Sequence, residues 1–153
     1  MGKEIERKFL VKGDSWKNGE GTQYRQGYLN QNKERTVRVR IAGDRGFLTI
    51  KGLTVGAVRR EYEYEIPCRE AEEILEYLCE KPLIEKIRYK IPYRSVIVEV
   101  DEFLLENRGL VLAEVELESE NQIFEKPDWL GKEVTDDPRY HNSNLVQNPF
   151  SCW

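Results

Sequence analysis

The sequence has little of what disulfide-rich proteins and histidine-based metal sites require. It contains one histidine and three cysteines, and no two cysteines are spaced as CxxC. An odd number of isolated cysteines argues against a disulfide framework or a zinc site and is typical of a reducing compartment. The single histidine, His141, is expected at the surface or at a helix cap. We therefore predict a cytoplasmic protein without a histidine-rich metal centre.

Long apolar runs and an excess of basic residues are also missing. No apolar run approaches the roughly 18–20 residues of a membrane-spanning helix, and the first residues do not form the apolar core of a signal peptide. The 24 Lys and Arg residues are outnumbered by 28 Asp and Glu residues, for a net charge of −4. Nucleic-acid-binding domains are usually basic. We expect neither a membrane nor a nucleic-acid partner, and the 153 residues predict a single domain spanning 1–153.

What the sequence does contain is a series of segments in which charged and apolar residues alternate. This pattern is typical of a β-strand with one charged and one apolar face. In RTVRVRI, for example, Arg38 and Arg40 share one face and Val37 and Val39 the other. The pattern predicts eight strands, at residues 3–11, 22–29, 35–41, 47–51, 58–66, 83–91, 96–103 and 110–118.

Helical periodicity is limited to short segments. Residues 68–80 place Ala71, Leu75 and Leu78 on one face, and Pro82 follows them. A helix is therefore predicted there. The tail is less regular, and we predict a short helix at residues 119–125, a turn or short helical piece at 127–131, and a C-terminal helix within 136–146.

Eight antiparallel strands joined by short turns are compatible with two architectures. An open sheet would leave its charged face in water. A closed barrel would enclose that face and pack helices and loops outside. Alternation is the same in both, and on alternation alone the open sheet is the simpler interpretation.

The charges are sorted by strand, which a merely solvated face would not require because like charges on one strand repel. Arg38, Arg40, Lys86 and Arg88 make basic strands, whereas other strands carry only acidic residues on that face. A triphosphate bound with Mg²⁺ needs cations around its oxygens and carboxylates around the metal. No GxxxxGK[ST], HExxH or GxSxG motif is present. The chemistry must therefore come from carboxylates, cations and metal.

The first strand combines both signs, since Glu4, Glu6 and Lys8 share one face. The run EIERK resembles the ExExK signature of the CYTH superfamily, the triphosphate tunnel metalloenzymes, and in particular its short bacterial members. The resemblance covers nearly the whole chain. The other motifs that carry it, in chain order, are Arg38-Val39-Arg40, Lys51, Glu61-Tyr62-Glu63, Glu85-Lys86-Ile87-Arg88, Asp101 and Glu114-Val115-Glu116.

This resemblance implies a mainly β (α+β) fold, a closed eight-stranded antiparallel β-barrel tunnel with helices packed outside and a C-terminal helix. It thereby favours the barrel over the open sheet. It also implies Mg²⁺- or Mn²⁺-dependent hydrolysis of inorganic triphosphate to pyrophosphate and phosphate. Adenylate cyclase and thiamine triphosphatase activities remain alternatives within the family, and a polyphosphate- or nucleotide-binding module without turnover remains an alternative outside it. The expected partner is a small triphosphate, and the chain is expected to be a monomer or a homodimer.

The resemblance also implies roles for individual residues, each of which could instead form a structural salt bridge in the tunnel. The implied triphosphate-binding residues are Lys8, Arg38, Arg40, Lys51, Lys86, Arg88 and, from the tail, Arg139. The implied metal-binding residues are Glu4, Glu6, Glu61, Glu63, Asp101, Glu114 and Glu116.

Tyr28 and Lys86 are the implied catalytic pair. A lysine among other cations has a lowered pKa and can share a proton with a phenol while water is activated. Two alternatives stay open: Tyr28 packs against the tunnel wall, or a glutamate polarises a metal-bound water.

Overall fold

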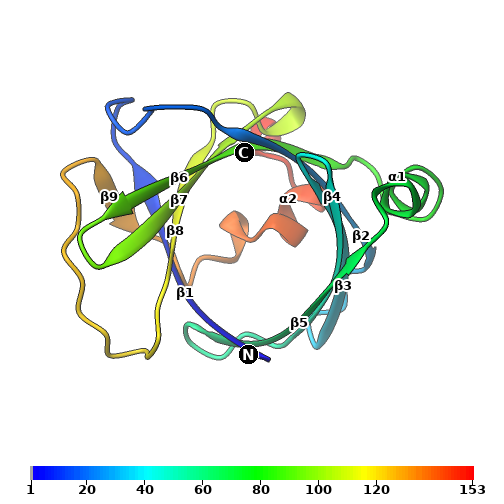
Figure 1. The fold of residues 1–153 in the computed structure, drawn as a ribbon, viewed down its shortest axis with the longest axis horizontal. Helices are drawn as coiled ribbons and strands as arrows, with labels where there is room; N and C mark the ends of the chain where they lie inside the picture. The colour runs from blue at the N-terminus through cyan, green and yellow to red at the C-terminus, as the bar shows by residue number, and fades with distance from the viewer. Residues whose placement is uncertain (1) are drawn as a thin grey trace.

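Eight strands form the wall of a barrel in the computed structural model, which describes residues 2–153 (Figure 1). All eight begin and end within a few residues of the predicted boundaries, so the alternation pattern located them correctly. They are β1 Lys3–Val11, β2 Thr22–Asn30, β3 Arg35–Ala42, β4 Arg45–Gly52, β5 Val58–Ile66, β6 Ile84–Tyr93, β7 Val96–Phe103 and β8 Val111–Glu116.

The sheet closes because β1 pairs on one edge with β8 and on the other with β5. The strand order is β5-β4-β3-β2-β6-β7-β8-β1, all neighbours are antiparallel, and Glu4 lies opposite Arg59 where β1 meets β5. The closed barrel is therefore confirmed, and the open sheet that alternation alone favoured is wrong. A row of inward side chains from every strand now faces an enclosed interior.

A ninth strand, β9 (Leu130–Glu133), was not predicted. It pairs with β1 at Phe9 and Val11, on the edge that β5 occupies near the start of β1. The predicted turn at 127–131 is confirmed where the N–H of Leu130 bonds to the carbonyl of Pro127, but Leu130 and Gly131 already belong to β9. The physical reason is that an exposed strand edge recruits a partner, whereas four residues are too few to show a clear alternation.

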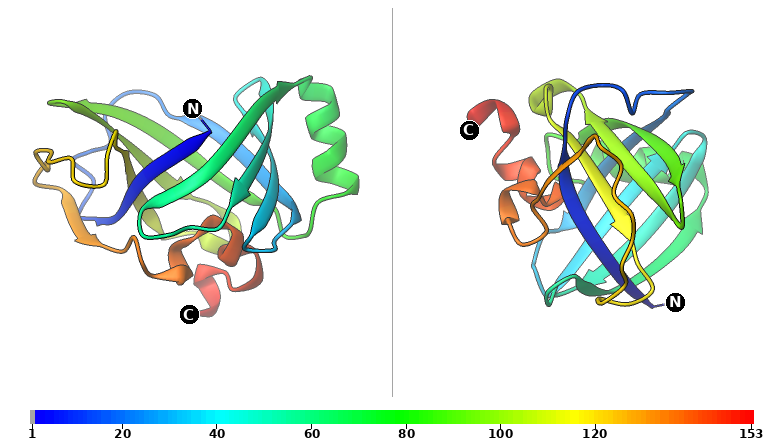
Figure 2. Two further views of the ribbon diagram at one scale, coloured as in Figure 1. Left: turned by 90° about the horizontal axis from the view of Figure 1, so that it is seen from below. Right: turned by 90° about the vertical axis from the view of Figure 1, so that its left-hand side faces the viewer.

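The apolar faces of the strands point outward and are covered by three separate elements. Helix α1 (Cys68–Tyr77) packs Ala71 and Leu75 on the outside of β3 and β4 (Figure 2). The loops 12–21 and 117–129 contribute Trp16 and Phe124 to a core over β1, β7 and β8. The predicted helix at 119–125 is wrong, because this segment contains only turns and irregular backbone.

The C-terminal tail crosses one end of the barrel (Figures 1 and 2). It contains the short 3₁₀ helices η2 (Pro138–Tyr140) and η3 (Phe150–Cys152) and, between them, helix α2 (Asn142–Gln147), so a C-terminal helix is confirmed; a further 3₁₀ turn, η1, spans Leu105–Asn107. Leu145 and Val146 of α2 are buried against Ile84 and Phe103, which line the inside of that end. No helix within residues 2–153 is long and apolar enough to span a membrane.

Candidate active site

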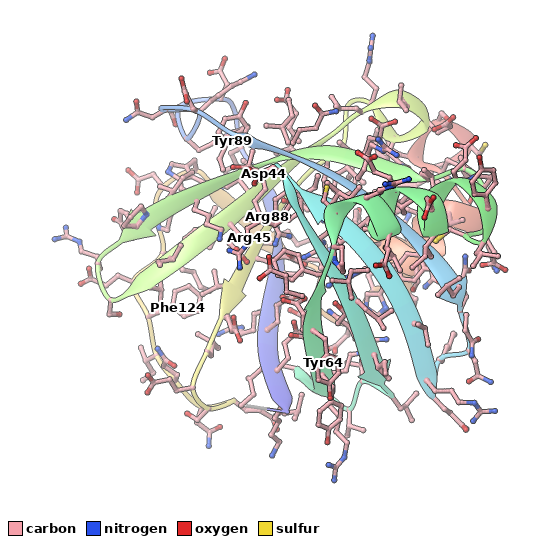
Figure 3. All side chains as sticks on the ribbon, turned by 45° about the vertical axis from the view of Figure 1, so that its right-hand side comes forward. Asp44, Arg45, Tyr64, Arg88, Tyr89 and Phe124 are labelled. Atoms are coloured by element: carbon pink, nitrogen blue, oxygen red, sulfur yellow. The ribbon has the colours of Figure 1, made fainter. Side chains whose placement is uncertain are left out.

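The interior of the barrel contains a polar cavity of about 270 Å³, and each of the eight barrel strands contributes at least one side chain to its lining. In Figure 3, Arg88 lies within the barrel whereas Tyr64 projects from its outer face, as the alternation requires. The predicted site residues that line the cavity are Glu4, Glu6, Lys8, Tyr28, Arg38, Arg40, Lys51, Glu61, Glu63, Lys86, Arg88, Glu114 and Glu116.

Arg139, predicted to reach the triphosphate, lies outside the cavity lining. Its guanidinium is exposed and pairs with Asp137 at 2.8 Å. It also stacks on Tyr140 and Trp153, with its central carbon 5.4 and 5.1 Å from their ring centroids. Arg139 therefore lies on the outer surface of the tail, where its contacts with Asp137, Tyr140 and Trp153 hold the end of the chain together.

Asp101, predicted to bind metal, is also absent from the cavity lining. Its carboxylate accepts two hydrogen bonds from Arg88, at 2.7 and 2.8 Å, and lies 2.8 Å from the ammonium of Lys86. These cations hold the pKa of Asp101 below its usual value despite burial, which acts in the opposite direction. The group is thus buried beneath two basic side chains and orients them.

Arg38 and Arg40 form the basic side of the cavity and retain unused donors. Arg38 donates from Nη2 to Thr49 at 3.2 Å and lies 3.4 Å from Glu63, but its buried Nε has no partner among residues 2–153. Arg40 donates from Nε to Gln26 at 2.9 Å, and within residues 2–153 no carboxylate lies within ion-pair distance of it. Burial, with repulsion from Arg38 and Arg88, lowers the pKa of Arg40 to about 10. A bound anion would offset both the burial of this charge and its repulsion by the other arginines.

Lys51 and Lys8 lie where the basic and acidic sides meet. The ammonium of Lys51 is 3.4 Å from Glu4 and 3.0 Å from Glu61. The ammonium of Lys8 is 3.4 Å from Glu114 and also donates to a backbone carbonyl of the tail. Each lysine can therefore contact a bound phosphate on one side and a carboxylate on the other.

Carboxylates crowd the opposite side of the cavity. Burial raises the pKa of Glu4 to about 6, although Lys51 opposes it. Burial and repulsion from Glu114 and Glu4 raise the pKa of Glu6 well above its usual value. Burial, with repulsion from Glu61, also raises the pKa of Glu116. Such crowding makes the ionised forms costly in the absence of a compensating cation.

A divalent ion suits this crowded side, because carboxylate oxygens are hard ligands for Mg²⁺ and Mn²⁺ and the ion would offset their repulsion. Across residues 2–153, no three acidic, histidine or cysteine side chains already converge in a metal-site geometry. Binding would therefore draw the carboxylates together. The donor chemistry fits the metal that the sequence predicts.

Lys86 is the most enclosed cation in the cavity wall, with 1% of its surface exposed. Its Nζ donates to Asn142 at 2.9 Å and lies 2.8 Å from Asp101. Burial lowers its pKa to about 7, with repulsion from Arg88 and Arg40 in the same direction and attraction to Asp101 against it. A lysine with such a pKa can take up or release a proton near neutrality.

Tyr28 lines the same cavity but does not neighbour Lys86 in the sheet. Tyr28 lies opposite Arg38 in the β2–β3 ladder, whereas Lys86 lies opposite Tyr24 in the β2–β6 ladder. Four residues of β2 therefore separate the two positions, roughly 13 Å along the strand. The register brings both side chains to one cavity without making them a direct pair.

Several lining residues were missed from the sequence. Arg59 donates to Gly52 and Thr36 at 2.6 and 3.0 Å and shares the inward face of β5 with Glu61. Strand parity alone would have identified Arg59. The tail supplies Thr135, His141, Asn142 and Ser143.

His141, expected at the surface or at a helix cap, occupies the N-cap position of α2, although its side chain makes no capping hydrogen bond within residues 2–153. It is half-buried and also lines the cavity, which was not expected. Burial, aided by Lys8 and Arg59, lowers its pKa. No local pattern in the sequence signals that the tail folds back into the barrel.

Comparison with known proteins agrees with this architecture. The inorganic triphosphatase of Acetivibrio thermocellus is 62% identical over 151 residues, which are 98% of this chain and 97% of that protein. The inorganic triphosphatase of Nitrosomonas europaea is 40% identical over 150 residues, 94% of this chain and 96% of that one. The crystal structure of the inorganic triphosphatase NE1496 matches with a TM-score of 0.65 at 36% identity, covering 93% of this chain and 96% of that one. The CYTH domain profile matches residues 2–145, and the chain therefore belongs to the CYTH domain family.

Proposed function

We propose that the protein is a divalent-metal-dependent inorganic triphosphatase that hydrolyses tripolyphosphate to pyrophosphate and phosphate. The observation that carries the proposal is the sorting of charge in one cavity, where arginines with unused donors face a group of crowded carboxylates. Relatives that are 62% and 40% identical are inorganic triphosphatases, which supports the same activity. A small anion bound with metal is the expected partner, and the cytoplasm is the expected compartment.

The basic residues would bind the triphosphate. Arg38 and Arg40 line the cavity and, within residues 2–153, keep guanidinium N–H donors without a hydrogen-bond partner. Lys8, Lys51 and Arg88 line the cavity beside them. A charge-assisted bond to phosphate is about twice as strong as a neutral one, and several strands contribute one each. Because the wall is a closed sheet, these groups are fixed before the substrate arrives, which reduces the entropy lost on binding.

Glu4, Glu6, Glu61, Glu63, Glu114 and Glu116 are the candidate metal-binding residues. A bound Mg²⁺ or Mn²⁺ would neutralise phosphoryl oxygens and polarise the phosphorus for attack. Asp101 instead orients Lys86 and Arg88 from beneath the lining.

Hydrolysis adds a water oxygen to the terminal phosphorus and breaks its bond to the bridging oxygen, which leaves with pyrophosphate. The water must lose a proton. With a pKa of about 7, Lys86 is partly neutral near neutrality and can accept that proton at Nζ. Asp101 and Asn142 hold Nζ in place. Tyr28 lines the cavity opposite Arg38 and is a second candidate for contact with the water or the phosphate.

The test is phosphate release from tripolyphosphate, pyrophosphate, ATP and thiamine triphosphate, with Mg²⁺, with Mn²⁺ and with excess EDTA. We expect release from tripolyphosphate only with metal. Tight binding without release would identify a non-catalytic module, and cyclic AMP from ATP would identify a cyclase. Full activity in EDTA would exclude the role given to the carboxylates.

A further inference from the structure

Asn142, on the tail that closes the barrel, joins the basic side of the cavity to Lys86. It is the first residue of α2 and lines the cavity. Its Oδ1 accepts hydrogen bonds from Lys86 Nζ at 2.9 Å and from Gln26 Nε2 at 3.1 Å. The Oε1 of Gln26 accepts from Arg40 Nε at 2.9 Å. Two amides thus form a continuous chain between two cations of the site.

The chemistry of the two cations fixes which way each amide faces. A guanidinium only donates, so Gln26 turns its oxygen to Arg40 and its nitrogen to Asn142. Protonated Lys86 also only donates, so it requires the oxygen of Asn142, and the N–H of Gln26 requires the same oxygen whether or not Lys86 carries its proton. Reversing Asn142 would set its NH₂ group against two donors at once. Both ends of the chain therefore impose the same orientation.

This orientation turns the NH₂ group of Asn142 away from Gln26 and Lys86. Within residues 2–153, Nδ2 donates to no other group, although Asn142 lines the cavity. We propose that Asn142 is a substrate-binding residue that donates from Nδ2 to a phosphate oxygen of the polyphosphate, and that Gln26 is the positioning residue that fixes this orientation. Gln26 is fully buried and does not line the cavity.

The tail is held firmly enough to present such a donor. Lys8 Nζ donates to the carbonyl of Tyr140 at 3.1 Å, two residues before Asn142. Leu145 and Val146 anchor the other side of Asn142 in the apolar end of the barrel. A donor fixed in advance loses little freedom when the anion binds.

The inference rests on the proposed function, and two variants at one position test it. Asn142→Leu removes both the donor and the acceptor for Lys86, so we expect KM for tripolyphosphate to rise at least ~10-fold and kcat to fall. Asn142→Asp restores the acceptor but not the donor, so kcat should recover while KM stays raised. Gln147→Glu adds the same charge to an exposed position of α2 and should leave KM within ~2-fold of wild type. An unchanged KM in both Asn142 variants, or a parallel recovery of KM and kcat in Asn142→Asp, would overturn the role of the donor.

Gln26→Glu tests the positioning role. The new carboxylate still accepts from Arg40 but repels the oxygen of Asn142, so the amide should reverse and KM should rise. In the Asn142→Leu background no amide remains to reverse, and the same substitution should have little further effect. An equal effect in both backgrounds would assign it to neutralisation of Arg40 and overturn the inference for Gln26.

Metal-free binding of tripolyphosphate, measured by titration calorimetry, separates this inference from the proposed function. A wild type that binds tripolyphosphate but does not hydrolyse it would contradict the proposed activity, whereas the Asn142 variants would still be judged by their Kd. We expect Kd to weaken at least ~10-fold in Asn142→Leu and Asn142→Asp, and not in Gln147→Glu. Wild-type affinity in both Asn142 variants would refute the contact.

Discussion

Side chains in the cavity differ in how far neighbouring groups already neutralise their charges. The variants expected to weaken substrate binding most are those of the least neutralised cations. Within residues 2–153, Arg40 has no carboxylate partner and donates one hydrogen bond to Gln26, so a bound phosphate is its main prospective partner. We expect Arg40→Ala to raise KM for tripolyphosphate about 10- to 100-fold, the equivalent of roughly 1.5–3 kcal/mol for a charge-assisted bond. Arg45→Ala is the control, because Arg45 is exposed and pairs with Glu65 at 2.7 Å. Wild-type kinetics in folded Arg40→Ala would remove Arg40 from the binding site.

Glu116 offers the corresponding test on the acidic side. It lies in the cavity lining, and repulsion from Glu61 and Glu99 adds to the burial that raises its pKa. Glu116→Gln keeps the shape but removes a ligand charge, so activity should fall at least ~10-fold at low Mg²⁺ and recover in part at high Mg²⁺. Glu118→Gln, an exposed neighbour beyond the end of β8, should have no effect. A Glu116→Gln variant with unchanged metal dependence would place the metal elsewhere.

The raised pKa of Glu4 gives the metal-free protein a defined pH dependence. The folded protein binds the proton of the Glu4 carboxyl more tightly than the unfolded chain does. The stabilisation that this proton gives the folded state is therefore present below pH 4.5 and is lost as pH rises through about 6. The lowered pKa of His141 makes stability change with pH in the opposite direction. The quantity to compare is therefore the difference in unfolding free energy between the wild type and Glu4→Gln.

In EDTA, we expect the wild type to lose up to about 2 kcal/mol of unfolding free energy relative to Glu4→Gln between pH 4.5 and 7. Urea unfolding at several pH values measures this difference. Saturating Mg²⁺ should reduce it, because the ion favours the ionised carboxylate. A difference that stays constant with pH would show that Glu4 ionises normally.

At the scale of elements, the eight barrel strands and the C-terminal helix were predictable, whereas β9 and the return of the tail to the cavity were not. Alternation located eight strands because each has a charged face toward the cavity and an apolar face toward a covering element. Strand β9 escaped because pairing with the free edge of β1, and not its own four residues, determines its structure. Asn142 and His141 escaped for a similar reason, since a long-range return of the chain, without periodicity, brings them to the cavity.

Helix α1 shows how separate the outer packing is from the site. Leu75 is fully buried against the outside of β3 and β4 with Val39 and Ile41. Leu75→Ala should lower the unfolding free energy by about 2–5 kcal/mol, because a buried leucine leaves a cavity, while kcat is retained below the unfolding transition. Leu78 was predicted on the same apolar face, which is wrong because α1 ends at Tyr77 and Leu78 is 65% exposed; Leu78→Ala should therefore cost little stability. Loss of kcat in folded Leu75→Ala would show that α1 shapes the cavity.

At the scale of the whole molecule, the alternation pattern could not distinguish an open sheet from a closed barrel, and the pairing of β1 with β5 shows the barrel. Alternation is identical in an open sheet and in a barrel, and the closing contact is a three-residue pairing of β1 with β5. Only the order of the charged motifs, through the family resemblance, indicated the barrel. Once the sheet closes, parity places thirteen of the predicted residues in one cavity. Asp101 is the exception on the strands because it lies beneath Lys86 and Arg88, and Arg139 is the exception on the tail because it pairs with Asp137 outside the cavity.

The closed barrel also leads to a prediction about substrate choice. A base could stack only on an aromatic side chain whose ring face is open. Trp16 is buried against Tyr89, and Tyr24 lies beneath the guanidinium groups of Arg40 and Arg88, so neither is free to stack. The adenosine of ATP would therefore gain little, and its ester reduces the charge presented to the cations.

We expect kcat/KM for tripolyphosphate to exceed that for ATP at least ~100-fold, or about 2.7 kcal/mol in transition-state stabilisation. Pyrophosphate is too short to reach cations on several strands at once and should also be a poor substrate, because remote contacts position the reacting phosphoryl group. Side-by-side initial rates at saturating metal measure both ratios. Equal rates with ATP would mean that the cavity accepts a nucleoside in a way its lining does not reveal, and the substrate assignment would then be wrong even with the fold and metal site intact.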